Sequence, residues 1–396
     1  MTTESPDEGM RPFRHLVPAL RLHHGPDSLA EVSRELQRLG CQRAVIVCGA
    51  SLSRDAALMT TLRDALGARG AGVYAGVQAH SPLPAVLAAA EQLRALQADA
   101  VIAVGGGSAV VTARAASIVL AEGTSVQSLC TTRDATGVLH SPRLLATKLP
   151  QFVIPTTPTT ATLKAGSAVL DPTDGGRLAL FDPKTRAQAV FVHPRLLASS
   201  PRDLVVSAGL NTLAMAFEGL MSKRGDPFSD ALLMHATRLL VRELPKAALS
   251  NAIGPRAELM TASLMCGHGT DYTGAGIAIP LGHAVSARFH VDNGLANAIV
   301  LPHVVRFNED AAREGLEKLA LAMGVAGTDR PADAVAGALA QLLTTLGTPT
   351  RLRDIGVTQD ALPAMAEVSM ADWFVRDNPR RVEHAGQLHQ VLQDAW

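Results

Sequence analysis

The chain has few cysteines and no surplus of either charge. Its four cysteines, Cys41, Cys48, Cys130 and Cys266, fall in no CxxC pair and at no spacing typical of zinc ligands. This scatter favours reduced, mostly buried thiols over a disulfide framework or a zinc finger. Lysine plus arginine and aspartate plus glutamate number 36 each, so no long-range field attracts nucleic acid or an anionic membrane.

Long apolar runs are absent as well. Residues 1–15, MTTESPDEGMRPFRH, are polar and mixed in charge, without the apolar segment of a signal peptide. Later apolar runs are interrupted by charged residues or glycine before they reach the length of a membrane span. With 396 residues, 47% of them hydrophobic and 18% charged, the composition is typical of a globular enzyme of two domains. We expect a cytoplasmic protein whose partners include neither nucleic acid nor a membrane.

The first half alternates short apolar runs with helical patterns. Strands are predicted at residues 43–48, 72–77, 100–104 and 152–157, and helices at 52–66, 84–96 and from about 108. Buried runs of this length between helices indicate βαβ units and a parallel sheet. Three shorter strands, at 166–171, 177–182 and 188–194, are predicted to form a meander or a hairpin at the edge.

The pattern changes near Ser200. Residues 204–221, 228–240, 257–266 and later segments repeat their apolar positions every 3.6 residues, with no convincing strand. We therefore predict an α/β fold class with two domains. Residues 1–200 form a Rossmann-like, dinucleotide-binding domain with a parallel sheet, and residues 201–396 form an all-helical substrate domain.

A glycine-rich turn follows the predicted strand at 100–104. Gly105, Gly106 and Gly107 precede Ser108 and a helix. Glycines let a backbone approach a pyrophosphate closely, and the positive end of a helix favours anions. A tight βα turn without a ligand is the structural alternative for such a short motif.

Three segments together resemble the iron-containing (group III) alcohol dehydrogenases, a family that includes the metal-independent maleylacetate reductases. They are GGGS at 105–108, PTTPTTAT at 155–162 and GAGIAIPLGHAVSARFHVDNGLANAIVLPHVVRFN at 274–308. The resemblance implies the fold shared with the dehydroquinate synthases, a bound nicotinamide and a substrate cleft between the domains. Most relatives associate, so a homodimer is expected.

The resemblance also locates the metal site of the metal-using members. Their two histidines fall on Ile279 and Asn293, and their aspartate and histidine one helical turn apart fall on Asn211 and Met215. Zinc or iron needs neutral imidazole or ionised carboxylate, which none of these four residues offers. The sequence therefore predicts no metal.

Further cofactor contacts follow from the resemblance. Thr156, Thr157 and Thr160 would donate hydroxyls, and Arg177 stands where a lysine contacts the ribose or a phosphate. A solvated charge at a sheet edge is the alternative for Arg177. Many NAD-preferring members carry an aspartate at the position of Gly49. Ser51 stands two residues after this glycine and is also predicted to contact the cofactor. Because no carboxylate repels a 2′-phosphate at that position, NADPH as well as NADH is predicted to bind.

One titratable residue of the family's active site remains in the helical half. His283 matches the non-ligand histidine that lies near the nicotinamide and substrate, and we predict it as the general acid. A hydrogen-bonded core histidine is the alternative. Asn211 and Asn293 are predicted to donate side-chain amides to a carbonyl oxygen, as weak replacements for a Lewis acid.

The predicted substrate pocket is partly apolar. Met215 and Ile279 would exclude water, Arg288 would fix a substrate carboxylate, and His268 is a further candidate. Surface pairing with an acid is the alternative for Arg288.

The resemblance points to the maleylacetate reductase branch through AHSPL at 79–83, Asn211 and the segment at 350–357. The sequence thus predicts a metal-independent, NAD(P)H-dependent reductase of a small-molecule carbonyl or activated enone. Two alternatives stay open: a non-redox lyase or cyclase on the same scaffold, and a catalytically inactive nucleotide-binding homologue.

Overall fold

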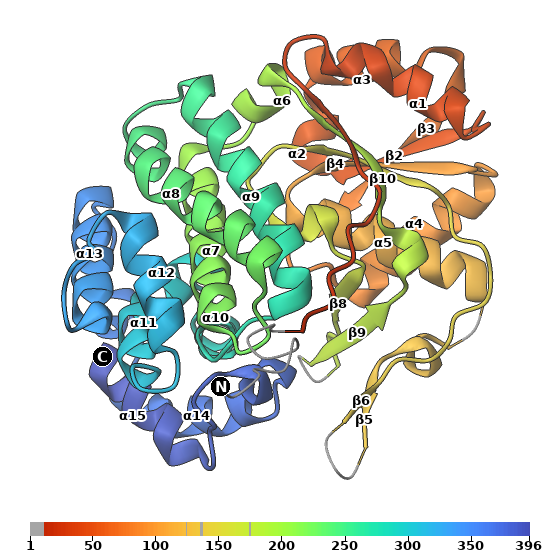
Figure 1. Cartoon of the computed structure of the whole chain (residues 1–396). Coiled ribbons are helices and arrows are strands. Elements are labelled where there is room, and N and C mark those ends of the chain that lie inside the picture. Colours follow the sequence, from red (N-terminus) through yellow and green to blue (C-terminus); the bar gives the residue numbers. More distant parts are fainter. Residues whose placement is uncertain (1–11, 124, 135–137, 174–175) are drawn as a thin grey trace, which may run out of the picture.

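The structure, a computed structural model, describes residues 12–123, 125–134, 138–173 and 176–396. Two halves lie side by side, an α/β half and a helical half (Figure 1). The strands of the α/β half are β1 (Arg21–His24), β2 (Ala44–Gly49), β3 (Gly70–Val77), β4 (Ala100–Gly105), β7 (Gln151–Pro155) and β10 (Ala187–Val192), with β5 (Thr132–Arg133), β6 (Leu139–His140), β8 (Gly166–Leu170) and β9 (Arg177–Phe181) outside the main sheet. Its helices are α1 (Val32–Arg38), α2 (Ala50–Ser53), α3 (Ala56–Leu66), α4 (Leu83–Ala95), α5 (Gly107–Glu122) and α6 (Pro194–Ala198).

The main sheet has the order β1-β10-β7-β4-β2-β3, and every neighbouring pair is parallel. The chain passes from β2 outward to β3 and then returns across β2 to β4. The direction of strand progression therefore reverses between β2 and β4, and in open parallel sheets ligands bind beside such a reversal, at the carboxyl ends of the strands.

Both faces of this sheet are covered by helices, as the continuous apolar runs predict. Along β2, Val45 and Val47 belong to the core under α4 and α5, whereas Ile46 and Cys48 belong to the core under α1 and α3. Successive strand residues point to opposite faces, so one strand supplies both cores.

Several strands differ from the prediction. The segments around 166–171 and 177–182 do form an antiparallel hairpin, β8–β9, but β10 leaves it and pairs in parallel with β7 and β1 inside the main sheet. The prediction of a meander was therefore wrong for β10. Its residues Ala189 to Val192 are all buried, because helices cover both faces of the main sheet. The prediction missed β1, whose sequence RLHH is too polar and short to show a strand pattern.

The helix predicted at 52–66 is two helices. Asp55 ends α2 and caps α3, since its carboxylate accepts from the Leu58 N–H at 3.0 Å. An aspartate side chain that accepts from an unpaired N–H group of the first turn favours the start of a new helix. The predicted single helix is therefore interrupted before α3. A short antiparallel ribbon, β5–β6, lies outside the predicted elements, with His140 Nε2 2.7 Å from Asp134 Oδ2.

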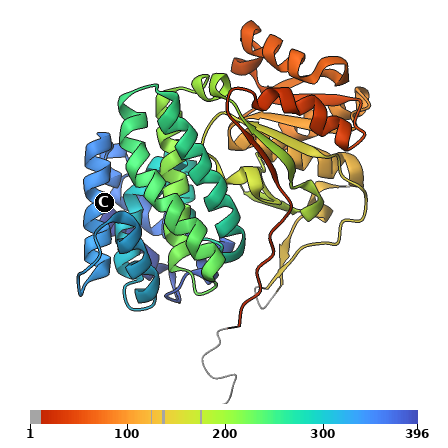
Figure 2. The ribbon, with the colours of Figure 1, turned by 45° about the horizontal axis from the view of Figure 1, so that its top comes forward.

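The helical half contains no strand among its residues, all of which are described. Its helices are α7 (Arg202–Met221), α8 (Pro227–Leu249), α9 (Ile253–Thr273), α10 (Ala278–Phe289), α11 (Asn293–Phe307), α12 (Arg313–Met323), α13 (Pro331–Leu346), α14 (Leu362–Met370) and α15 (Ala385–Ala395). Helices α8 and α9 run well beyond the segments predicted for them and pack against α7 side by side (Figure 2).

One core fills this half, and α7 passes through it. By length and composition α7 is the one helix among the described residues that could cross a membrane, but 78% of its most apolar window is buried in the fold. Contacts with α8, α9 and α11 therefore account for its apolar sequence.

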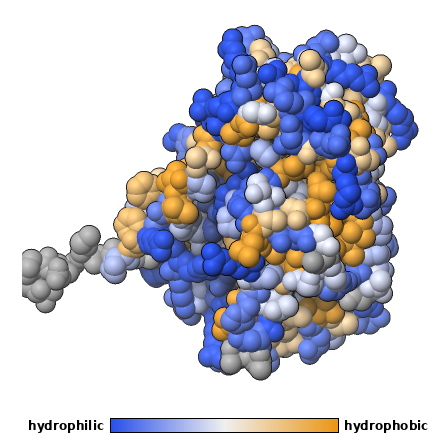
Figure 3. Space-filling view, turned by 90° about the vertical axis from the view of Figure 1, so that its right-hand side faces the viewer, coloured by the Kyte–Doolittle hydropathy of each residue, from blue (hydrophilic) through white to orange (hydrophobic). Residues whose placement is uncertain are grey.

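The surface mixes hydrophobic and hydrophilic residues. On the face in Figure 3, hydrophobic residues form small groups that hydrophilic ones separate. All four cysteines are buried and free of disulfides, which confirms the prediction for their burial. Burial raises the pKa of the Cys48 thiol to about 11 and that of Cys266 to about 12, so both are unreactive thiols at neutral pH.

Candidate active site

A cleft of about 560 Å³ opens where the carboxyl ends of β2, β3, β4 and β7 face the helical half. The first turns of α7 and α11 form its other wall, and His80 lies at its rim after β3. Ten residues predicted for the site line this cleft: Gly49, Ser51, Gly105, Gly106, Gly107, Ser108, Thr156, Thr157, Asn211 and Asn293. The sequence thus located the cleft from both halves of the molecule.

The glycine turn is built for a close backbone approach. Gly105 has a φ of +142°, a conformation that side chains strongly disfavour, and a Cβ on Gly106 would lie 2.8 Å from the Thr157 hydroxyl. Gly106 caps α5 without a side-chain hydrogen bond, so first-turn N–H groups of α5 face the cleft. Such free N–H groups at the positive end of a helix bind phosphate oxygens.

The threonine loop after β7 packs against this turn. Thr157 approaches Gly106, and the Thr159 hydroxyl would lie 3.0 Å from a Cβ on Gly107. Thr160, predicted as the third cofactor contact, begins a short 3-10 helix (Thr160–Leu163) and turns its carbonyl toward Gly267 of α9 instead. The structure therefore places Thr159, and not Thr160, on the cleft wall.

A buried arginine holds this loop in position. The Arg114 guanidinium on α5 is 0% exposed and donates to the carbonyls of Ala161 and Gly166, each at 2.7 Å. These bonds tie the residues after the loop to the helix that begins at the glycine turn. The two phosphate-facing segments therefore form one rigid unit.

The end of β2 carries a carboxylate that the sequence argument missed. Gly49 and Ser51 line the cleft, and so does Asp55, whose Oδ1 accepts from the Leu58 N–H. An aspartate six residues beyond Gly49 gave no signal in the sequence, because its position on the wall depends on the short helix α2.

Amide side chains line the wall of the helical half. Asn211 on α7 and Asn293 on α11 both line the cleft. The sequence argument missed Asn297, one turn after Asn293, which is 0% exposed and whose Nδ2 donates to Asn211 Oδ1 at 2.8 Å. Its spacing of four residues from Asn293 on one helix face was the available signal.

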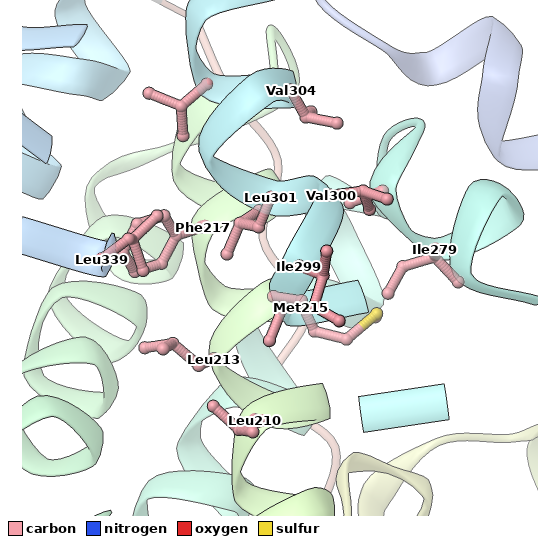
Figure 4. Close-up of a cluster of buried hydrophobic side chains, with 14 of the residues drawn as sticks. Leu210, Leu213, Met215, Phe217, Ile279, Ile299, Val300, Leu301, Val304 and Leu339 are labelled. Atoms are coloured by element: carbon pink, nitrogen blue, oxygen red, sulfur yellow. The ribbon is translucent and has the colours of Figure 1, made fainter. Parts of the chain in front are cut away.

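The donors at the four metal positions do not fit zinc or iron. Met215 and Ile279 are 6% and 3% exposed and pack together in the helical core, with the Met215 sulfur directed toward Ile279 (Figure 4). Asn211 and Asn293 add only neutral amides. Among the described residues no group of three or more histidine, cysteine, aspartate or glutamate side chains converges to hold a metal. The chemistry of the donors therefore disagrees with a metal ligand set at this position.

His283 lies on α10, close to the rim of the cleft. Its Nδ1 is 3.8 Å from Asp372 Oδ2, an ion-pair distance when the ring is protonated. Desolvation and then the charges of Arg177 and His283 lower the pKa of His80, so these two side chains lie within electrostatic range of His80. At 3.8 Å the two atoms are too far apart for a hydrogen bond, so Asp372 can orient the ring only through its charge.

The two predicted arginines lie in different surroundings. Arg177 on β9 donates to the His80 carbonyl at 3.3 Å, and burial lowers the pKa of its guanidinium, although Asp372 opposes this shift. It belongs to the rim near His80 and outside the residues that line the cleft. Arg288 is exposed at the end of α10, within the electrostatic range of Asp360. Its surroundings match the alternative of surface pairing.

The structure places His268 away from this site. It lines a separate small pocket with Arg186 and Asp271, and its Nε2 lies 3.4 Å from His15 Nε2. The N-terminal segment, residues 12–20, crosses α9 there, where the Tyr272 hydroxyl donates to the Leu16 carbonyl. The proposal of His268 as a pocket residue fails because its face of α9 is turned to this segment.

A buried glutamate lies behind the wall. Glu218, three residues after Met215 on α7, accepts from the Ala278 N–H at 2.5 Å and is 2% exposed. Burial raises the pKa of Glu218 to about 7, although backbone N–H groups of α10 and the segment before it lower it in part. Its second oxygen, Oε2, has no hydrogen-bond partner among the described residues.

A nucleotide-sized cleft at the carboxyl ends of a parallel sheet, closed by helices with a polar wall, defines a two-domain nucleotide-dependent enzyme. Residues 19–194 match the family described as iron-containing alcohol dehydrogenase, and residues 205–396 match the C-terminal part of the Fe-containing alcohol dehydrogenase family. The chain belongs to this family of NAD(P)-dependent oxidoreductases, and the match confirms both the resemblance and the predicted fold.

Individual relatives span the whole chain at low identity. The lactaldehyde reductase of Escherichia coli K12 is 28% identical over 387 residues, which cover 94% of this chain and 97% of that protein. The maleylacetate reductase of Rhizobium sp. MTP-10005 is 28% identical over 395 residues, 98% of each chain. The sulfoacetaldehyde reductase of Bifidobacterium kashiwanohense, solved with NAD⁺, superposes with a TM-score of 0.85 at 22% identity and covers 98% of this chain and 99% of that one.

Proposed function

We propose that this protein is a metal-independent reductase that uses NADH or NADPH to reduce an electrophilic carbonyl, such as that of a keto acid or an enone. The observation that carries the proposal is the contrast within one cleft. The glycine turn and threonine loop line the side where we propose that a nucleotide binds. At the predicted metal positions, Asn211 and Asn293 bring only amides to the opposite wall, while Met215 and Ile279 are buried in the helical core.

The nucleotide would be held by the chain's own backbone. First-turn N–H groups of α5 and the hydroxyls of Thr157 and Thr159 would bind its phosphates and ribose, and Gly106 leaves room for them. When bound, a reduced nicotinamide supplies a hydride. A solved neighbour that contains NAD⁺ supports this cofactor class.

The helical wall would act on the substrate oxygen. The Asn211 amide would hydrogen-bond the carbonyl, and His283, oriented by Asp372, would deliver a proton to the oxygen as negative charge develops there. Because neutral amides stabilise an alkoxide less than a metal ion does, an already electrophilic substrate suits this wall better than a simple alcohol. The names of two relatives, a lactaldehyde reductase and a maleylacetate reductase, fit such a carbonyl substrate.

Both nucleotides are proposed to bind, since Gly49 removes a carboxylate at the end of β2. The Asp55 carboxylate would oppose NADPH binding, because it lines the same end of the cleft and would repel a 2′-phosphate. The ratio of the Michaelis constants for NADH and NADPH tests this balance. We expect less than about a tenfold difference, and a hundredfold preference for NADH would contradict it.

Turnover tests the function itself. The purified protein is mixed with NADH or NADPH and with glyoxylate, 2-oxobutanoate, lactaldehyde or maleylacetate, and the loss of reduced-nicotinamide absorbance is followed. We expect nucleotide binding by calorimetry and turnover with at least one electrophilic carbonyl. Nucleotide binding without turnover across the panel would favour a non-redox lyase or cyclase, or an inactive homologue. No binding of either nucleotide would overturn the proposal.

We also propose a homodimer. The outer strand β1 has one unpaired edge among the described strands, and such edges are commonly covered by another chain. Sedimentation equilibrium that gives the mass of a single chain would contradict this.

A further inference from the structure

Three amides meet where α7, α10 and α11 come together. Asn211 comes from α7, while Asn293 and Asn297 lie one turn apart on α11. Two glycines permit this meeting. A Cβ on Gly294 would lie 1.8 Å from the Ser207 carbonyl of α7, and one on Gly282 would lie 1.7 Å from Asn297 Oδ1. The backbones therefore approach so closely that Asn297 is enclosed between α7 and α10.

The hydrogen bond between two of these amides has a direction. Asn297 Nδ2 donates and Asn211 Oδ1 accepts, at 2.8 Å. An amide has a donor side and an acceptor side, so a bond that occupies the acceptor side of Asn211 turns its Nδ2 group away from Asn297. Asn211 lines the cleft, and its Nδ2 has no acceptor among the described residues.

We propose that Asn297 is a positioning residue that fixes the Asn211 amide with its N–H groups toward the cleft, as the donor for a substrate carbonyl oxygen. The inference rests on the proposed reductase function. It adds the residue that decides whether Asn211 presents its N–H groups or its oxygen to the substrate carbonyl. The ligand class is a carbonyl compound with an accepting oxygen.

The burial of Asn297 makes this orientation rigid. The residue is 0% exposed, so no water competes for its Nδ2, and its own Oδ1 is enclosed against Gly282 without a hydrogen-bond partner in the described structure. A buried donor left without an acceptor would cost free energy, and that cost holds Asn211 Oδ1 in place. A preorganised donor of this kind needs no reorganisation as charge develops on the substrate.

The substitution Asn297→Asp tests the polarity directly, because it keeps the shape and reverses the hydrogen bond. An ionised Asp at 297 can only accept, so Asn211 would turn its Nδ2 inward and present its oxygen to the cleft. Asn297→Ala removes the bond and leaves Asn211 free to adopt either orientation. Because burial raises the pKa of a carboxyl at this position, the comparison is made at alkaline pH, where the carboxyl is ionised. A packing role then predicts that Ala is worse than the isosteric Asp, whereas positioning predicts that Asp is worse than Ala.

The matched control is Asn308→Asp. Asn308 ends the same helix, is 0% exposed and forms its own amide pair with Asn378, away from the cleft. This variant makes the same substitution at an equally buried asparagine that has no hydrogen bond to Asn211. We expect it to lower stability and to leave ligand binding unchanged.

The probe is isobutyramide labelled with ¹³C at its carbonyl, an unreactive carbonyl compound, added to the intact protein saturated with NADH. Wild type and Asn308→Asp should bind the probe and shift its carbonyl resonance downfield, as hydrogen-bond donation to the oxygen requires. In Asn297→Asp we expect affinity to fall about tenfold or more and the shift to disappear, with Asn297→Ala in between. Lowering the pH should restore both readouts in Asn297→Asp alone, because a protonated carboxyl can again donate to Asn211.

Equal binding by Asn297→Asp and wild type, a larger loss in Asn297→Ala, or no binding of isobutyramide to the wild-type NADH complex would each overturn the inference. None of these results touches the reductase proposal if NADH binds and carbonyl compounds are turned over. Failure of NADH to bind at all would instead remove the proposed function, and the inference with it.

Discussion

The two walls of the cleft differ in how far they keep the chemistry of their family. On the α/β side, Gly105, Gly106 and the threonine loop line the part of the cleft where the nucleotide is proposed to bind. On the helical side, Met215 and Ile279 are packed into the core where metal ligands would stand. The two walls are built from separate elements, so the proposed nucleotide site can be kept while the residues at the predicted metal positions change.

The largest expected effect concerns the glycine turn on the α/β side of the cleft. In Gly106→Val the new side chain would collide with the Thr157 hydroxyl and occupy the space in front of α5, so nucleotide affinity should fall at least about 100-fold. Calorimetric titration with NADH measures it. Gly337→Val is the control, since a Cβ there meets nothing within 4 Å. Undiminished affinity in Gly106→Val would place the nucleotide elsewhere.

A second change restores the ligands of the other wall. The variant Asn211→Asp, Met215→His, Ile279→His, Asn293→His should bind Zn²⁺, because it offers three imidazoles and a carboxylate. We expect an affinity at least about 100-fold above that of wild type, measured by competition with a chelating dye. The single variant Met215→His is the control and should bind no better than wild type. Equal, tight zinc binding by wild type would mean that other residues hold a metal.

His283 carries the third prediction. Without its proton donor the reaction wall keeps only its amides, so His283→Ala should lower kcat about 100-fold and leave the affinity for NADH unchanged. Asp372→Asn should lower kcat less, because it affects only the orientation of the ring at Nδ1. Steady-state kinetics with any accepted carbonyl measures both. Unchanged turnover in His283→Ala would exclude it as the general acid.

The smallest effect is on stability and concerns Glu218 behind the reaction wall. Its pKa is about 7 in the folded protein against 4.5 as the ordinary value. The folded state thus binds a proton that the unfolded state has lost, so the free energy of unfolding should fall as pH rises through this window and then level off. A shift of this size corresponds to on the order of 3 kcal/mol.

Glu218→Gln should remove most of this fall, as chemical denaturation at about pH 5 and about pH 8 would show. Glu243→Gln on α8 is the control with the opposite sign. Desolvation raises the pKa of Glu243, but Arg242 and Lys246 outweigh it and lower the pKa, so its loss should destabilise the protein at neutral pH. The assignment would be contradicted if the free energy of unfolding rose from about pH 5 to about pH 8 by the same amount in the wild type and in Glu218→Gln.

The sequence predicted the parallel sheet and the helical half because their apolar periods are long and regular. It failed where local capping or context decides. Asp55 breaks a helix that periodicity alone would continue, and β10 joins the main sheet although its residues also suit a hairpin. β1 was missed because RLHH carries no apolar alternation.

The candidate site was predictable to a similar degree. Glycine and threonine motifs have fixed spacing, so the nucleotide wall could be located from the sequence. Thr159 and Asp55 could not, because each reaches the site through the path of the surrounding backbone. Asn297 had a signal, its spacing of four residues from Asn293, but its contact with Asn211 depends on how the helices pack. His268 shows the reverse error, since one face of α9 was assigned to the cleft and instead contacts His15.

The central claim is that the cleft works without a bound cation, and one measurement addresses it most directly. The protein is purified, dialysed against a chelator, assayed for iron and zinc by elemental analysis, and tested for carbonyl reduction before and after the metal is added back. The account predicts full turnover with far less than one metal ion per chain and no gain on adding Zn²⁺ or Fe²⁺. Stoichiometric iron or zinc whose removal abolishes turnover, and whose return restores it, would contradict it.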